Sequence, residues 1–180
     1  MAERMIALLR GINVGKAKRV AMADLRRLLS DLGYTDIKTH LNSGNAVFSG
    51  PARSVTGAAE KIRQAIATEL GVECAVMTRT GDELAAVVEG NPLADVAVDP
   101  SRYLVAFLSA APDQATVKGI QGRDFGQDQL RIVGTEAYLW CAGGILDSPL
   151  SKLAWSKELG VSATTRNWNT VLKLAELAAS

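Results

Sequence analysis

Histidine and cysteine are scarce in this 180-residue chain, which contains one histidine and two cysteines. His40 is therefore the only imidazole available as the base of a catalytic triad, and its neighbours give no sign of that role. Cys74 and Cys141 have no second cysteine or histidine at the spacing of metal ligands. We expect both thiols to lie in the hydrophobic core, and we expect neither a bound metal nor a cofactor.

Long apolar runs are also lacking. No run reaches the roughly 18 residues that a membrane helix needs, and residues 5–9 are too few for the core of a signal peptide. Hydrophobic residues make up 48% of the chain, which is enough for a sizeable core in one domain or in two small ones. We therefore expect a cytoplasmic protein without membrane contact, and the sequence leaves its oligomeric state open.

Acidic residues are few near the N-terminus. Residues 1–27 contain seven basic and two acidic residues, a net charge of +5, although the whole chain carries only +1. A local cluster of this kind attracts anions, whereas a protein that binds duplex nucleic acid usually has a broader basic face. A solvated loop and helix surface would show the same charges.

Two halves, residues 1–90 and 91–180, are predicted from a repeated order of elements. In the first half, periodicity predicts strands at 5–9, 36–41, 46–49 and 72–78, and helices at 22–32, 55–70 and from a capping box at Thr80 to about Gly90. In the second half it predicts strands at 103–108, 129–133, 136–141 and after Gly160. Helices are predicted there at 113–120 and 149–159, with a final one capped by Thr164 or Thr165. Each half has the order βαββαβ plus a trailing helix. We predict an α+β fold of two ferredoxin-like halves, each an antiparallel sheet covered by helices.

Three polar segments stand among the apolar runs: residues 10–16, 42–45 and 164–169. They combine glycine and amide side chains with Arg and Lys, whose donors suit anions. In the ferredoxin-like topology, the loop after the first strand and the turn between the second and third strands lie at the same end of the sheet. The two segments could line one pocket at that end of the sheet. The topology does not fix the position of Arg166 relative to this pocket. The candidate ligand-binding residues are Arg10, Asn13, Lys16, Arg19, Asn42, Ser43, Asn45, Arg166, Asn167 and Trp168.

The first loop differs from a phosphate loop of the nucleotide hydrolases. Gly11, Gly15 and Lys16 are spaced one residue too closely, and Ala17 stands where a magnesium-binding Ser or Thr is required. A simpler anion site of backbone amides with Lys16, Lys18 and Arg19 remains. The leading prediction is a binding module for a small anionic ligand that contains a phosphate or nucleotide, with catalysis left uncertain.

Two other functions stay open. Alternation places Tyr103, Phe107, Tyr138 and Trp140 on one face of the second predicted sheet, where they would stack the bases of single-stranded nucleic acid or lie buried in a core. Residues 91–180 carry eight basic and nine acidic side chains, which argues against nucleic acid. The other possibility is a protein-interaction or structural role without a ligand.

The sequence resembles a bacterial family known as domain of unknown function 1697 over residues 5–179. The resemblance rests on three stretches, residues 8–15, 41–48 and 163–168 with 171–174. It implies a duplicated ferredoxin-like fold and no established activity. The chain departs from the family pattern at Lys16, Ala17 and Lys18, which stand where Gly, Lys and Asn are usual, at Ala21 in place of Pro, and at Asn42 in place of Gln.

Overall fold

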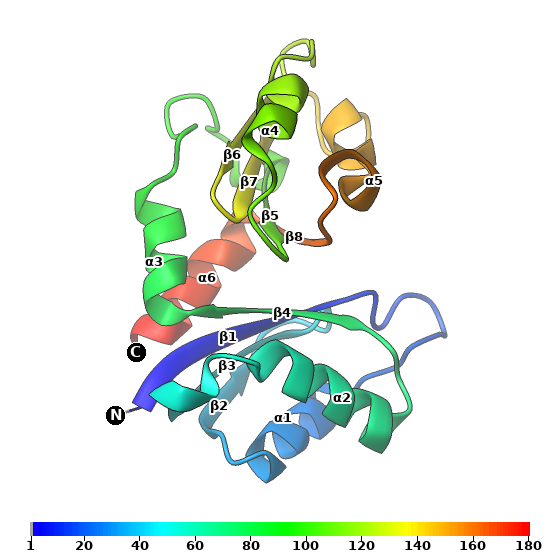
Figure 1. Cartoon of the computed structure of the whole chain (residues 1–180), viewed down its shortest axis with the longest axis vertical. Coiled ribbons are helices and arrows are strands. Elements are labelled where there is room, and N and C mark those ends of the chain that lie inside the picture. The colour runs from blue at the N-terminus through cyan, green and yellow to red at the C-terminus, as the bar shows by residue number, and fades with distance from the viewer. Residues whose placement is uncertain (1) are drawn as a thin grey trace. The chain divides into compact units, whose positions relative to one another are not determined.

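The computed structural model describes residues 2–180, which form two compact units. One unit extends to Ala86 and also includes Lys173–Ser180, and the other is Val87–Leu172. The boundary between the units therefore falls inside two helices, α3 (Gly81–Glu89) and α6 (Trp168–Ala179). Each unit contains one four-stranded antiparallel sheet (Figure 1).

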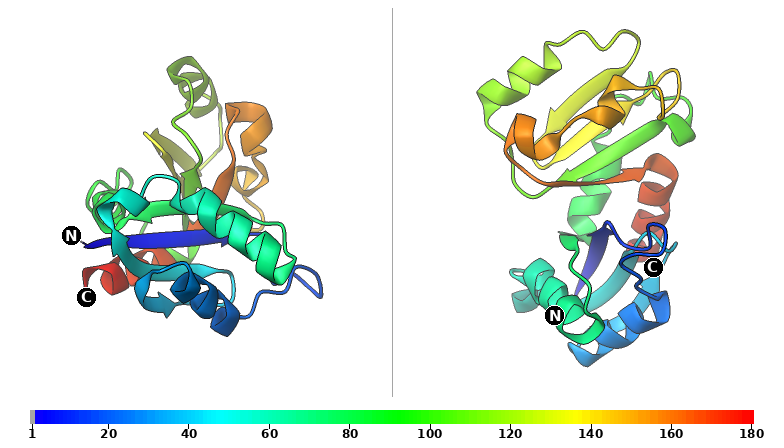
Figure 2. Two further views of the ribbon diagram at one scale, coloured as in Figure 1. Left: turned by 60° about the horizontal axis from the view of Figure 1, so that its bottom comes forward. Right: turned by 90° about the vertical axis from the view of Figure 1, so that its right-hand side faces the viewer.

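The sheet of the first unit has the strand order β2-β3-β1-β4. Two helices, α1 and α2, lie on one of its faces (Figures 1 and 2). This is the ferredoxin-like arrangement that the order of elements predicts. The elements are β1 (Ala2–Arg10), α1 (Met22–Asp31), β2 (Thr35–Thr39), β3 (Asn45–Pro51), α2 (Ala58–Leu70) and β4 (Ala75–Thr80).

Strand β1 is central and buried on both faces. Met5, Ala7 and Leu9 point toward the helices and belong to a core cluster with residues of α1 and α2. Ile6 and Leu8, which point the other way because side chains alternate along a strand, are 1% exposed. A strand with one solvent-facing side would alternate apolar and polar residues, so the continuous apolar run from 5 to 9 agrees with cover on both sides.

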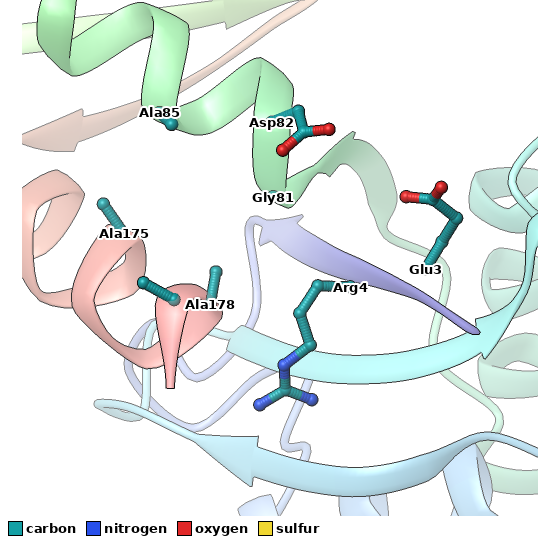
Figure 3. Close-up of a pocket in the computed structure, with 8 residues that line it drawn as sticks. Glu3, Arg4, Gly81, Asp82, Ala85, Ala175 and Ala178 are labelled. Atoms are coloured by element: carbon teal, nitrogen blue, oxygen red, sulfur yellow. The ribbon is translucent and has the colours of Figure 1, made fainter. Parts of the chain in front are cut away.

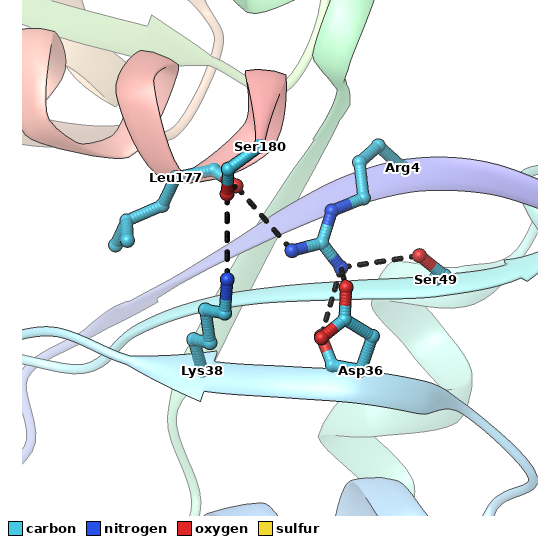
Figure 4. Close-up of polar contacts among 6 residues, drawn as sticks. All are labelled: Arg4, Asp36, Lys38, Ser49, Leu177 and Ser180. Carbon is cyan, nitrogen blue, oxygen red and sulfur yellow. Dashed lines mark hydrogen bonds and ion pairs between the residues drawn. The ribbon is translucent and has the colours of Figure 1, made fainter.

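The opposite face of this sheet carries the C-terminal part of α6. The guanidinium group of Arg4 donates hydrogen bonds to the carbonyl oxygen of Leu177 at 3.3 Å and to Ser49 Oγ at 3.1 Å (Figure 4). Arg4 also forms an ion pair with Asp36 at 3.3 Å. A cation near the last carbonyl groups of a helix stabilises that end of the helix.

The second unit repeats the plan, with the strand order β6-β7-β5-β8. Alternate residues of β5, from Leu104 to Leu108, belong to one core cluster with Ile120 of α4 and Leu159 of α5. The duplicated fold predicted from the order of elements is therefore confirmed. The elements are β5 (Tyr103–Leu108), α4 (Gln114–Gln121), β6 (Gln129–Val133), β7 (Glu136–Trp140), α5 (Trp155–Leu159) and β8 (Ala163–Asn167).

Two local predictions in this unit were wrong. The helix expected over 149–159 is a 3₁₀ turn at Pro149–Lys152 followed by the separate helix α5, because Leu153 takes an extended backbone with ψ 130°. The cap expected at Thr164 or Thr165 is Asn167, whose side-chain oxygen accepts a hydrogen bond from the backbone N–H of Thr170 at 2.9 Å. Both threonines lie within β8 and pair with β5.

None of the helices among residues 2–180 is both long enough and apolar enough to cross a membrane.

Candidate functional site

The first two polar segments meet at one end of the first sheet, and Asn13 joins them. Its side-chain amide donates one hydrogen bond to the carbonyl oxygen of Val20 at 2.8 Å and another to that of Asn42 at 2.7 Å. Its side-chain oxygen accepts from the backbone N–H of Val20 at 2.9 Å. The predicted proximity of loop 11–19 and turn 42–45 is thus observed, and the amide of Asn13 is used to hold it.

Turn 42–45 is fitted tightly against the end of β1. The backbone N–H of Leu9 donates to the carbonyl oxygen of Gly44 at 2.8 Å. Gly44 has a φ of +95°, and a Cβ at this position would lie 2.7 Å from Leu9 Cβ, so only glycine fits without movement. Asn45 is fully buried, and its amide donates to the carbonyl oxygen of His40 and to Ser43 Oγ. Like Asn13, it serves the local backbone.

Loop 11–19 projects beyond the strands of its unit (Figure 1). Arg10, Lys16, Lys18 and Arg19 are exposed, and no ion pair among residues 2–180 involves any of these four side chains. We call these four residues the cation cluster. Lys18 has a φ of +50°, which is uncommon for a residue with a side chain. Its ammonium group lies close enough to Cys74 to oppose part of the effect of burial, which raises the pKa of that thiol.

An open depression of about 350 Å³ lies between the loop, the turn and the start of α1. Its lining residues are Asn13, Arg19, Val20, Ala21, Met22 and Asn42. Helix α1 begins at the edge of this depression. Its N-cap residue is Ala21, which has no side-chain acceptor, so no side chain caps the free N–H groups of the first turn. The depression therefore combines one member of the cation cluster with a helix N-terminus.

The third polar segment lies in the second unit, where Asn167 and Trp168 have partners. Asn167 caps α6, and the ring of Trp168 packs on Tyr103 with 4.9 Å between ring centroids. Arg166 lies on β8 opposite Val105, and burial lowers the pKa of its guanidinium group to about 10. Of the ten candidate residues, the structure thus brings the seven from Arg10 to Asn45 together in the first unit.

The aromatic face of the second sheet is buried. Tyr103 and Phe107 are 0% exposed, Tyr138 is 3% exposed and Trp140 is 7% exposed. The hydroxyl of Tyr103 donates to Asn91 Oδ1, and that of Tyr138 donates to the carbonyl oxygen of Val87 at 2.9 Å. Base stacking needs accessible ring faces, and these four rings offer almost none.

Groups for acid–base or metal chemistry do not gather at the site. Among residues 2–180, no three His, Cys, Asp or Glu side chains are arranged to hold a metal ion. Cys74 and Cys141 are buried and are not joined in a disulfide, as their apolar surroundings predicted. The half-buried His40 uses its backbone N–H to pair with Asn45 across the turn. The arrangement can attract and hold an anion, and it shows no base placed to act on one.

A second cavity, of about 230 Å³, was not predicted from the sequence. Arg4 and Glu3 of β1 lie on one side of it, Gly81 and Asp82 of α3 on another, and alanines of α6 on the third (Figure 3). A charged residue inside an apolar strand was the available signal, because an inward-facing Arg needs partners. Asp36, Ser49 and Leu177 supply partners for the two terminal nitrogens of Arg4, whereas its Nε is buried without a hydrogen-bond partner among residues 2–180. The cavity is also smaller than typical ligand pockets of about 300–1,000 Å³.

Comparison with known proteins places the chain in a family. Residues 2–138 match the model of a family described as a protein of unknown function, DUF1697. The fold is similar to that of the conserved bacterial protein SP0830 from Streptococcus pneumoniae, with a TM-score of 0.77 and 22% sequence identity over 99% of each chain. No curated protein matches the sequence. The chain therefore belongs to the DUF1697 family, as its resemblance to that family had indicated, and the match includes the first two of the three motif stretches.

Proposed function

We propose that this protein is a binding module for a small anionic ligand that carries a phosphate group, held at the cation cluster and the adjacent turn. The observation that supports the proposal is the cluster itself, in which four exposed cations have no ion-pair partner in the described chain. A protein that used these charges for its own stability would pair them with carboxylates, and residues 4–23 and 37–59 contain none.

The local backbone supports the same proposal. Asn13, Lys18 and Leu41 all have positive φ values, and such strained positions gather where a segment is held for binding. The uncapped first turn of α1 offers N–H groups beside Arg19, and a phosphate accepts from such groups. Rigid loops with free donors lower the entropy lost when a ligand binds.

Thermal unfolding with a panel of phosphate compounds tests the proposal. A ligand present at one hundred times its dissociation constant is expected to stabilise the protein by about 2.7 kcal/mol. The charge reversals Lys16→Glu and Arg19→Glu are expected to abolish this stabilisation, because each replaces an attraction with a repulsion.

Arg53→Glu provides the matched control. Arg53 is an exposed arginine of the same unit. Strand β3 begins at the turn with Asn45 and ends at Pro51, and Arg53 lies just beyond that second end, away from the turn. Its reversal changes the net charge equally and is expected to leave ligand stabilisation intact. The proposal is wrong if no compound of the panel stabilises the wild-type protein, or if all three reversals reduce the stabilisation equally.

A further inference from the structure

The first unit exposes two large hydrophobic side chains, and each is next in sequence to an asparagine that lines the depression of the candidate site. Among its described residues, Val14 is 69% exposed and Leu41 is 55% exposed. Val14 follows Asn13 in loop 11–19, and Leu41 precedes Asn42 in the turn, so the Asn13–Asn42 hydrogen bond holds their backbones close together. Single exposed apolar residues are ordinary, but here two lie on segments that one hydrogen bond joins, and one of these segments carries Lys16, Lys18 and Arg19.

The local backbone conformations of Val14 and Leu41 are also well defined. Leu41 has a φ of +63°, a conformation that is unfavourable for leucine and common for asparagine or glycine. The segment after Val14 turns back on itself, with a bridge between Val14 and Ala17 and a hydrogen bond from Ala17 N–H to the carbonyl oxygen of Val14. Leu41 thus keeps an apolar side chain in solvent where asparagine or glycine would suit the backbone better, and Val14 keeps one in solvent at a bridged turn.

From these features we infer that the ligand is a nucleoside polyphosphate, whose base lies against Val14 and Leu41 while its phosphates contact the cation cluster. The inference rests on the proposed function and names the ligand class for the same site. Four cations match the charge of a di- or triphosphate better than that of a single phosphate group. The apolar pair supplies a contact that inorganic phosphate or a sugar phosphate would not use.

The open position of the two side chains favours a base over an acyl chain. An acyl chain needs a cavity with apolar walls on all sides, whereas Val14 and Leu41 are exposed at the surface, each next in sequence to a residue that lines the open depression. A nucleobase has apolar faces and polar edges, so one face can contact aliphatic side chains while its edges stay in water.

The experiment compares a nucleoside triphosphate with inorganic triphosphate by isothermal titration of the full chain in a buffer with EDTA. The two compounds share the charged part, and only the first has a base. The wild-type protein is expected to bind the nucleotide about tenfold more tightly, which corresponds to modest apolar burial. Lys16→Glu is expected to abolish binding of both compounds.

Two variants remove the apolar contact without harming the turns. Val14→Thr keeps the side-chain shape, and Leu41→Asn suits the left-handed backbone, so the double variant is expected to fold normally. The double variant should lose most of the tenfold difference in affinity between the nucleotide and inorganic triphosphate. Its affinity for inorganic triphosphate should equal that of the wild type.

Other outcomes separate the two proposals. Equal binding of both compounds by the wild-type protein and the double variant would overturn the inference and leave the anion site standing. No binding of either compound, with other phosphates also inert in thermal unfolding, would overturn both. If the double variant instead loses binding to a single-stranded oligonucleotide or to phosphatidylserine vesicles, while mononucleotides are inert, the occupant is that macromolecular surface and the inference is wrong.

Discussion

Asn13 and Asn42 are 29 residues apart in sequence, and a 2.7 Å hydrogen bond from the side-chain amide of Asn13 to the carbonyl oxygen of Asn42 joins them. The same amide also contacts the carbonyl oxygen of Val20, so one side chain fixes the loop after β1 to the turn between β2 and β3. The exposed charges and apolar residues of the site all lie on segments that this contact organises.

Asn13→Ala is expected to destabilise the protein by about 2 kcal/mol, because three hydrogen bonds are lost and alanine disfavours the φ of +54°. Asn13→Gly removes the same hydrogen bonds and permits that backbone, so it should cost about 1 kcal/mol less. Urea unfolding of both variants measures the difference. A glycine variant as stable as the wild type would show that the side-chain hydrogen bonds contribute nothing.

Gly44→Ala is expected to cost about 3 kcal/mol or more. Its new Cβ would meet Leu9 Cβ at 2.7 Å and Ile12 Cδ1 at 2.9 Å, and its φ of +95° is unfavourable for alanine. Gly11→Ala is the matched control, since Gly11 has a φ of +77° and nothing within 4 Å of the added atom. It should cost only the backbone strain of about 1–2 kcal/mol. Similar melting temperatures for the two variants would contradict this account.

Because the hydroxyl of Tyr138 is buried, we expect the protein to lose stability at high pH. Burial raises the pKa of its hydroxyl to about 12, above the value of 10.0 in the unfolded chain. Between these values the folded protein holds a proton that the unfolded chain releases, so the free energy of unfolding falls as pH rises from 10 to 12. Tyr138→Phe removes the contribution of Tyr138 to this dependence and loses the hydrogen bond to Val87, at a cost of about 1 kcal/mol at neutral pH. The buried Tyr103, whose pKa is also raised, keeps its own contribution in both proteins. Urea unfolding of both proteins at pH 8 and 11 should show a smaller deficit for the variant at pH 11, and an unchanged deficit would refute the assignment.

Asn167→Ala is expected to destabilise the protein by about 1 kcal/mol, because the first turn of α6 loses its cap. Asn167→Asp keeps an oxygen at the same place and should be nearly neutral. Thr165→Ala changes an exposed residue of β8 that caps nothing in the structure, so its effect should be within about 0.5 kcal/mol. Equal losses for Asn167→Ala and Thr165→Ala would argue for the cap that the sequence had suggested.

The order of strands and helices could be read from the sequence because both periodicities are strong. The alternation of Leu104, Ala106 and Leu108 and the helical spacing of Leu25, Leu28 and Leu29 follow directly from which face is buried. Short elements were harder to predict. The residues from Pro149 to Leu159 have helical spacing, but an extended Leu153 interrupts them, and no local signal marks that break.

The first two polar motifs meet in the structure, but the sequence could not show which of their side chains bond to the backbone and which face solvent. Asn13, Asn45 and Asn167 satisfy backbone groups, while Arg10 and Lys16 face solvent, and a linear pattern does not separate these uses. The aromatic residues of the second sheet posed the same difficulty. Alternation placed Tyr103 and Tyr138 on one face, and only the three-dimensional structure shows that this face is buried.

The contact between Arg4 and Leu177 spans 173 positions of the chain and has a consequence for synthesis. All four strands of the first sheet leave the ribosome before the second unit does, whereas residues 173–180, which belong to the first unit, leave after it. The part of α6 that contacts the sheet face at Arg4 is therefore translated long after the sheet itself. The first unit is completed last, and during that interval an apolar sheet face is open to chaperones or to misassembly.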